Sequence, residues 1–164
     1  MGQYKSIEDF KNSMVEKMKE NFTTHGYLTP VMFFLKDGQL LINKIPNDCL
    51  ASRQSKEMLA VTIKRICTEP NVLAGGIIIE AYLAKVSPDS ESAKKALANK
   101  ISVSQMPERV DAIVMIFSTP EKEELITYEV DCKNKIVKDM DEDMKKGVST
   151  GKGTFSGFFN WTKN

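Results

Sequence analysis

The stretch Val72–Ser87, VLAGGIIIEAYLAKVS, decides the fold of this 164-residue chain. Its apolar and β-branched residues, with no charge before Glu80, predict a long β-strand inside a sheet. Alternate residues of a strand point to opposite faces, so Glu80 shares a face with Ile78 and Tyr82. An ionised carboxylate among apolar neighbours needs a hydrogen-bond partner or an opposite charge. The sequence therefore predicts that Glu80 lies inside a well-packed sheet beside a companion group.

A β-hairpin is predicted before this strand, in Val31–Asn43, VMFFLKDGQLLIN. The dipeptide Asp37-Gly38 between two apolar runs favours a two-residue type I′ turn. Both faces of this hairpin are apolar, so we expect both to be covered, by helices or by another subunit. The predicted cross-strand pairs are Leu35 with Leu40, Phe33 with Ile42, and Phe34 with Leu41.

Two amphipathic helices are predicted on either side of this hairpin. The first begins after Ser6, whose side chain can cap it, and ends at His25-Gly26, because glycine suits the left-handed position after a helix. The second runs from about Ser52 to Thr68. It stops before Pro70, since the residue preceding a proline is disfavoured in a helix.

The chain after the long strand is predicted to leave the sheet and then return to it. Ser87–Glu108 is expected to be an excursion over the sheet edge, with a short helix capped by Asp89 or Ser90. A second hairpin follows, with strands Asp111–Ser118 and Leu125–Val130.

The order of elements is helix, two strands, helix, strand, excursion, two strands, which predicts an α+β fold. We expect a single antiparallel or mixed sheet of about five strands with two main helices packed on it. The order resembles the profilin-like and roadblock-like layouts, in which two hairpins flank a middle strand. Residues 1–146 are expected to form one domain. Residues 147–164, rich in glycine and aromatic residues, are expected to be a tail docked on it, because exposed aromatic clusters are uncommon on monomers.

The composition argues against several classes of protein. With 23 Lys and Arg against 22 Asp and Glu, the net charge of +1 does not indicate a nucleic-acid binder, which gathers a basic excess. Three cysteines without C-x-x-C spacing indicate neither disulfides nor zinc and fit a reducing cytoplasm. No apolar stretch approaches the roughly 18 residues of a membrane span. We therefore expect a cytoplasmic protein without a cofactor, a metal site, a nucleic-acid partner or a membrane anchor.

Four residues are candidates for chemistry or ligand binding. Glu80 could act as a general base or bind a ligand, or it could be a structural partner of Arg109 or of a backbone N–H, or face water at an edge. His25, the single histidine, gains from the negative end of the helix dipole, and this structural role explains it fully. Arg109 could instead hold a ligand phosphate or carboxylate. Tyr82 joins Glu80 and Arg109 as a ligand-binding candidate.

Short motifs along Thr24–Val130 carry a resemblance. They are His25-Gly26, Pro30 with Phe33 or Phe34, Asp37-Gly38, Glu80-Ala81-Tyr82 and Pro107-x-Arg109. Together they resemble a group of small bacterial and phage proteins, in which a His-Gly, a hairpin, a Glu-Ala-aromatic strand and a Pro-x-Arg segment recur in this order. That group more often has tryptophan where this chain has Tyr82. The resemblance implies a bacterial or viral cytosolic setting and no particular activity.

Two functions are compatible with these observations. The first is a non-catalytic accessory protein that binds a partner protein, a further copy of itself or a small ligand. It is favoured because the sequence has no nucleophile–base pair, metal cluster or nucleotide-binding loop. The alternative is a small hydrolase-type enzyme that uses Glu80 as base, with His25 and Arg109 handling charge. That alternative requires the three side chains to meet in one pocket.

Overall fold

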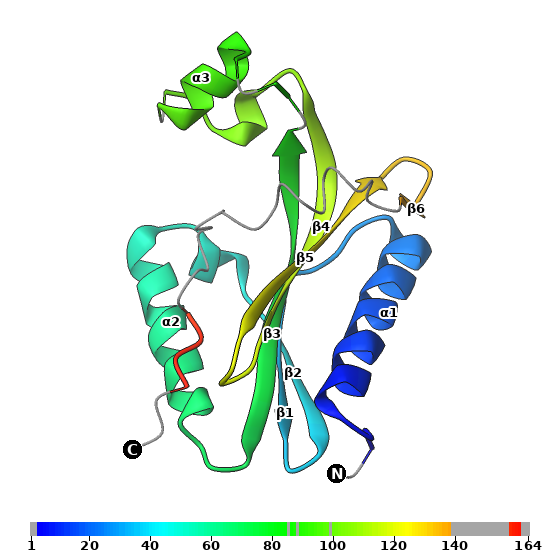
Figure 1. Cartoon of the computed structure of the whole chain (residues 1–164), viewed down its shortest axis with the longest axis vertical. Coiled ribbons are helices and arrows are strands. Elements are labelled where there is room, and N and C mark those ends of the chain that lie inside the picture. Colours follow the sequence, from blue (N-terminus) through cyan, green and yellow to red (C-terminus); the bar gives the residue numbers. More distant parts are fainter. Residues whose placement is uncertain (1–2, 85, 88, 99, 139–157, 162–164) are drawn as a thin grey trace.

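The structure, a computed structural model, describes residues 3–84, 86–87, 89–98, 100–138 and 158–161. This part forms an α+β fold around one antiparallel six-stranded sheet with the order β2-β1-β3-β4-β5-β6 (Figure 1). The helices are α1 (Ile7–His25), α2 (Arg53–Cys67) and α3 (Glu91–Leu97), with 3₁₀ turns at Asn47–Leu50 and Val103–Gln105. The strands are β1 (Val31–Lys36), β2 (Gln39–Lys44), β3 (Val72–Ala84), β4 (Arg109–Ser118), β5 (Glu123–Asp131) and β6 (Ile136–Val137). The predicted α+β class with a single antiparallel sheet is confirmed, and β3 lies between the two predicted hairpins.

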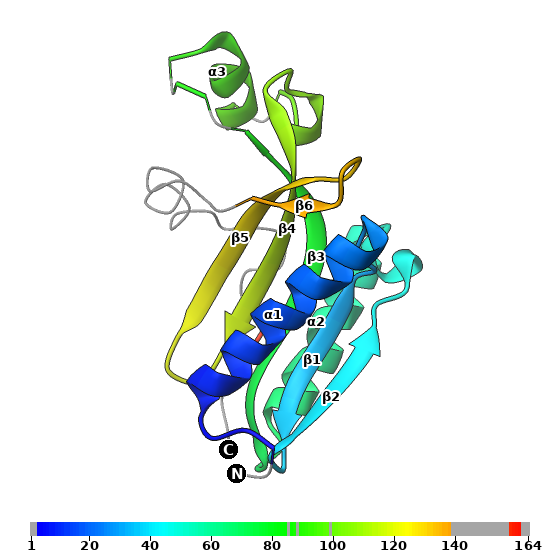
Figure 2. The ribbon, with the colours of Figure 1, turned by 90° about the vertical axis from the view of Figure 1, so that its right-hand side faces the viewer.

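Helix α1 covers one face of the sheet and α2 covers the other (Figure 2). The Asp9 N–H donates to Ser6 Oγ at the start of α1, and Gly26 adopts the left-handed conformation (φ 80°) at its end, as predicted. The apolar stripe of α1 packs on the sheet in a first core, with Phe10, Met14, Met18, Phe22, Phe33, Ile78 and Phe117 among its members. On the opposite face, a second core contains Phe34, Ile63, Cys67, Ile77 and Phe159.

The first hairpin has the predicted turn and register. Asp37 and Gly38 both have positive φ (53° and 74°), as a type I′ turn requires, and all three predicted cross-strand pairs are present. The prediction that both faces are covered holds only for β1. Strand β2 is the outermost strand, and its Leu41 and Ile42 are 42% and 51% exposed. In β2, Leu40 packs against the first core, whereas the other residues of the strand are exposed.

The excursion between β3 and β4 does not lie over the sheet edge, which corrects the prediction. Residues 79–84 of β3 and 109–111 of β4 continue beyond the ends of β1 and β5, and we call this two-stranded extension the arm. Helix α3, capped by Ser90, lies at the far end of the arm (Figures 1 and 2). Because α3 has little apolar surface, it gains little from packing on the sheet.

Part of the predicted tail packs on the second core. Phe159 is buried, with its ring centroid 6.2 Å from that of Phe34. The indole N–H of Trp161 donates to Ser118 Oγ at 2.8 Å. The remaining residues of the predicted tail, 147–157 and 162–164, lie outside the described residues.

Candidate functional site

Glu80 lies where β3 passes the end of β1. The last β1 residue that pairs with β3 in this direction is Val31, opposite Ile78, so Glu80 has a neighbouring strand on its β4 side alone. The Leu28 N–H donates to Glu80 Oε1 at 2.6 Å, and the residue is exposed. The predicted buried position is therefore wrong. Its companion group is the backbone N–H of the loop that joins α1 to β1.

His25 is the last residue of α1, at the negative end of the helix dipole. Its ring centroid lies 5.9 Å from that of Tyr27, which is 60% exposed. Both side chains line a groove of about 560 Å³ between α1 and the β1–β2 hairpin. The groove also contains Met14, Lys17, Met18, Glu20, Asn21, Leu28, Thr29, Val31, Ile42, Lys44 and Ile78.

Arg109 and Tyr82 lie together on the arm. The Arg109 guanidinium carbon is 5.9 Å from the centroid of the Tyr82 ring, and its Nη1 donates to the carbonyl of Met106 at 3.3 Å. Because Tyr82 pairs with Asp111 and Ala84 with Arg109, these side chains share the face of the arm that also carries Glu80. The cation therefore rests on an aromatic ring, an arrangement that stabilises an exposed arginine modestly.

The Cys132 thiol lies beside this face of the arm, a neighbour that the sequence analysis did not predict. Its Sγ is 3.6 Å from Asp111 Oδ2. Partial burial raises the pKa of Cys132, and the nearby carboxylates of Asp111 and Glu80 raise it further. The thiol is therefore less ionised at neutral pH than an ordinary cysteine, which is the opposite of what a nucleophile needs.

The structure gives the three proposed catalytic residues different surroundings. Glu80 lines a second cavity of about 420 Å³ with Lys56, His25 lines the groove, and Arg109 lines neither of the two. Among the described residues, no hydrogen bond or ion pair joins any two of them. A joint catalytic role for the three stays a prediction without a contact to support it.

The open edge of β2 is the feature that the sequence analysis did not single out as a site. In the type I′ hairpin, Lys36 and Gln39 form a hydrogen-bonded pair, so the odd-numbered residues of β2 bond to β1. The bond from the Ile45 N–H to the Pro30 carbonyl continues this pattern. The N–H and C=O groups of Leu40, Ile42 and Lys44 therefore point away from the sheet. The sequence signal was present in the doubly apolar hairpin, which needs a cover on both faces.

The described residues contain no group of three or more His, Cys, Asp or Glu placed to hold a metal ion. Within the same residues, no helix is long and apolar enough to cross a membrane. Comparison of the chain with family models, with curated proteins and with solved structures gave no match, so the resemblance to small bacterial and phage proteins stays a prediction.

Proposed function

We propose that this chain is a non-catalytic accessory protein that binds an extended polypeptide segment along β2. The observation that carries this proposal is an edge strand that combines two features: main-chain groups without a partner among the described residues, and the exposed apolar side chains of Leu41 and Ile42. Edge strands pair with added strands through their main chain, and natural proteins commonly prevent this with charges or proline. From Gln39 to Asn43, QLLIN, β2 has neither.

The groove beside β2 supports the same function. Side chains of an added strand alternate between the two faces, so every second one would lie beside the groove between α1 and the hairpin. Tyr27 and Ile42, which are 60% and 51% exposed, line this groove and offer apolar surface to the side chains of an added strand. Main-chain pairing would supply affinity, and the groove would select the side chains.

A polypeptide fits this surface better than a small ligand does. The groove has the volume of a ligand pocket, but its lining is mixed in charge, with Lys17, Glu20 and Lys44. A small molecule in it would leave the outward N–H and C=O groups of Leu40 and Ile42 to water. An extended segment would hydrogen-bond to these edge groups and also place its side chains beside the groove.

The test is site-specific photo-cross-linking from position 42. A photoreactive amino acid replaces Ile42 in the full chain, the cells that produce it are irradiated, and cross-linked peptides are identified by mass spectrometry. The control carries the same amino acid at Leu125, which is 43% exposed on β5. We expect defined polypeptide cross-links from position 42 at several times the yield from position 125. Equal yields, or none from position 42, would disprove the proposal.

A further inference from the structure

Resting on the proposed function, we infer that the segment bound along β2 is β2 of a second copy of this chain. The two strands would run antiparallel about a twofold axis at Leu41, joining two sheets into one. In a twofold interface the same patch serves both copies, so the strand must be complementary to itself. Strand β2 meets this condition in its sequence and in the direction of its free main-chain groups.

The register between the two β2 strands follows from the N–H and C=O groups of β2 that point away from the sheet. Hydrogen-bonded pairs of an antiparallel ladder form between residues whose N–H and C=O point at each other, here the even-numbered residues. Centring the pair on Leu41 places Leu40 opposite the partner's Ile42, and Ile42 opposite the partner's Leu40. Each such pair exchanges two hydrogen bonds. Leu41 then lies opposite the partner's Leu41, and Gln39 opposite the partner's Asn43.

Every side chain in this register meets a compatible one. The three central pairs are aliphatic, and the outer pairs are two side-chain amides, which hydrogen-bond to each other. The register stops before Gly38, whose carbonyl already accepts from the Gln3 N–H at 3.3 Å. Lys44 then lies beside the partner's turn, opposite the partner's Gly38 and next to the partner's Asp37.

The other side of the sheet is protected against strand pairing. Among the described residues, β6 pairs with β5 at Val130 and Asp131, and the Lys138 N–H donates to the Glu129 carbonyl, which leaves residues 123–128 of β5 without a neighbouring strand on that side. That part carries two neighbouring carboxylates, Glu123 and Glu124. Inserting charges of one sign is a common way to prevent edge pairing. From Gln39 to Asn43, strand β2 carries no charge, and a pairing restricted to this stretch produces a closed dimer rather than a growing chain.

The dimer would also cover the surfaces that the monomer leaves open. Leu41 would be shielded on its edge side by the partner's Leu41, and Ile42 by the partner's Leu40. The two grooves beside α1 would lie on the same face of the joined sheet, because the odd- and even-numbered side chains keep their faces across the twofold axis.

Sedimentation of the full chain up to about 0.1 mM, with two charge variants, tests the inference. The parent chain is expected to dimerise. Leu41→Lys and Leu41→Glu each place like charges directly opposite one another and are expected to raise the dimer dissociation constant about tenfold or more. An equimolar mixture of the two variants is expected to recover a dimer, because each lysine then faces a glutamate. Leu125→Lys, a substitution at matched exposure on β5, is expected to leave the dimer intact.

Circular dichroism of each variant separates lost pairing from lost folding, and Leu41→Cys gives a second measurement. Residues opposite each other in a non-hydrogen-bonded pair are close enough for a disulfide, so mild oxidation should link two chains through position 41. Leu125→Cys should not form this link. A monomeric parent chain, a series of larger species, or a dimer insensitive to Leu41 would each overturn the inference. If position 42 cross-links to another polypeptide and the parent chain is monomeric, the bound segment is not a second copy of this chain. The proposed function would still hold in that case.

Discussion

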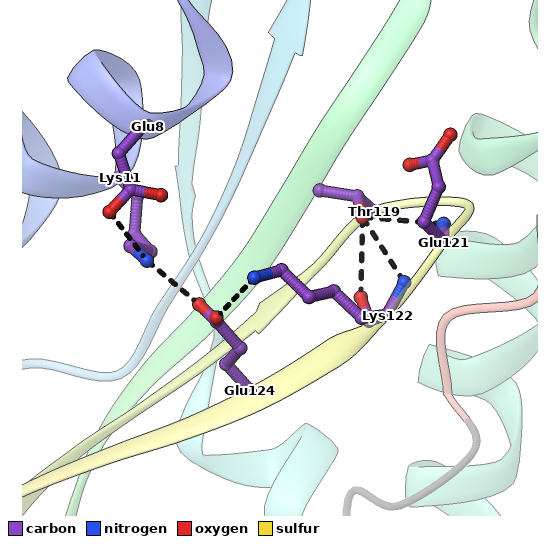
Figure 3. A network of polar contacts seen from close by, with 6 residues as sticks. All are labelled: Glu8, Lys11, Thr119, Glu121, Lys122 and Glu124. Carbon is purple, nitrogen blue, oxygen red and sulfur yellow. Dashed lines mark hydrogen bonds and ion pairs between the residues drawn. The ribbon is translucent and has the colours of Figure 1, made fainter.

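Lys11 Nζ on α1 lies 3.0 Å from Glu124 Oε2 on β5, and this ion pair fastens the first half of α1 across the sheet (Figure 3). Glu124 also accepts from Lys122 Nζ at 2.7 Å, and Lys11 pairs with Glu8 at 2.9 Å. Burial by itself would lower the pKa of Lys11, but its bonds to Glu8 and Glu124 outweigh burial and raise it. The ammonium of Lys11 is largely shielded from water, so this pair is stronger than a fully solvated one.

Glu124→Gln is expected to lower the free energy of unfolding by about 0.5–1 kcal/mol at pH 7. The hydrogen bond from Lys122, followed by that from Lys11, holds the pKa of Glu124 below its usual value of 4.5. A lowered folded-state pKa means that the stabilisation is present above the unfolded-state pKa and is lost as the pH falls through the folded value. The difference between parent and variant should therefore shrink as the pH falls below 4.5 and vanish only below the lowered folded-state pKa of Glu124. Urea unfolding at several pH values measures it.

Glu121→Gln is the matched control, because it removes the same charge from the same β4–β5 hairpin. The Glu121 N–H bonds to Thr119 Oγ1, whereas no ion pair involves its carboxylate among the described residues. An equal loss of stability in both variants would show that net charge, rather than the Lys11–Glu124 pair, is responsible.

Gly76→Ala is expected to lower the free energy of unfolding by about 3 kcal/mol or more. A methyl group at Gly76 would overlap Phe33 Cζ and the Ile116 carbonyl oxygen, and the backbone atom cannot move aside without disturbing the β3–β4 ladder. At Gly75 the nearest atom is Phe34 Cδ1 at 2.7 Å, a side-chain atom that can shift. Gly75→Ala should therefore cost less. Chemical denaturation measures the free energy of unfolding of both variants. A larger loss of stability for Gly75→Ala than for Gly76→Ala would contradict this explanation.

Local signals in the sequence were sufficient for the elements whose boundaries are set locally. Ser6 and Gly26 fix the ends of α1, and Asp37-Gly38 fixes the turn and hence the register of the hairpin. In each case one or two residues satisfy backbone groups within the same segment, so no distant contact is needed to predict the outcome.

The environment of Glu80 could not be predicted in this way. Period-two alternation assigns Glu80 to a face of the strand, but burial depends on whether a neighbouring strand extends past it. The pairing of β1 with β3 ends at Ile78, where the chain enters β1 from the loop that follows α1. The open edge of β2 was missed for the same reason, because the position of a strand within a sheet is set by tertiary packing.

Glu80→Ala is expected to loosen the loop between α1 and β1 and to lower the free energy of unfolding by about 1 kcal/mol. Its carboxylate is the acceptor for the Leu28 N–H, and a charged acceptor makes a stronger bond than a neutral one. Amide hydrogen exchange at Leu28 should accelerate in Glu80→Ala and less in Glu80→Gln, which keeps an acceptor oxygen. Unchanged exchange at Leu28 in both variants would show that the bond does not hold the loop.

Asp111→Asn is expected to make Cys132 react faster with a thiol-alkylating reagent. Partial burial, followed by the negative charges of Asp111 and Glu80, raises the pKa of the thiol, so only a small fraction is thiolate at neutral pH. Removing the Asp111 charge lowers that pKa, although burial still holds it above the usual value. Below the pKa, each unit by which it falls increases the thiolate fraction about tenfold, and the alkylation rate should rise several-fold. Mass spectrometry of the Cys132 peptide follows this rate from pH 7 to 9, and Asp89→Asn, a substitution on the excursion, serves as control. An equal rate in Asp111→Asn and the parent chain would show that Asp111 does not influence the thiol.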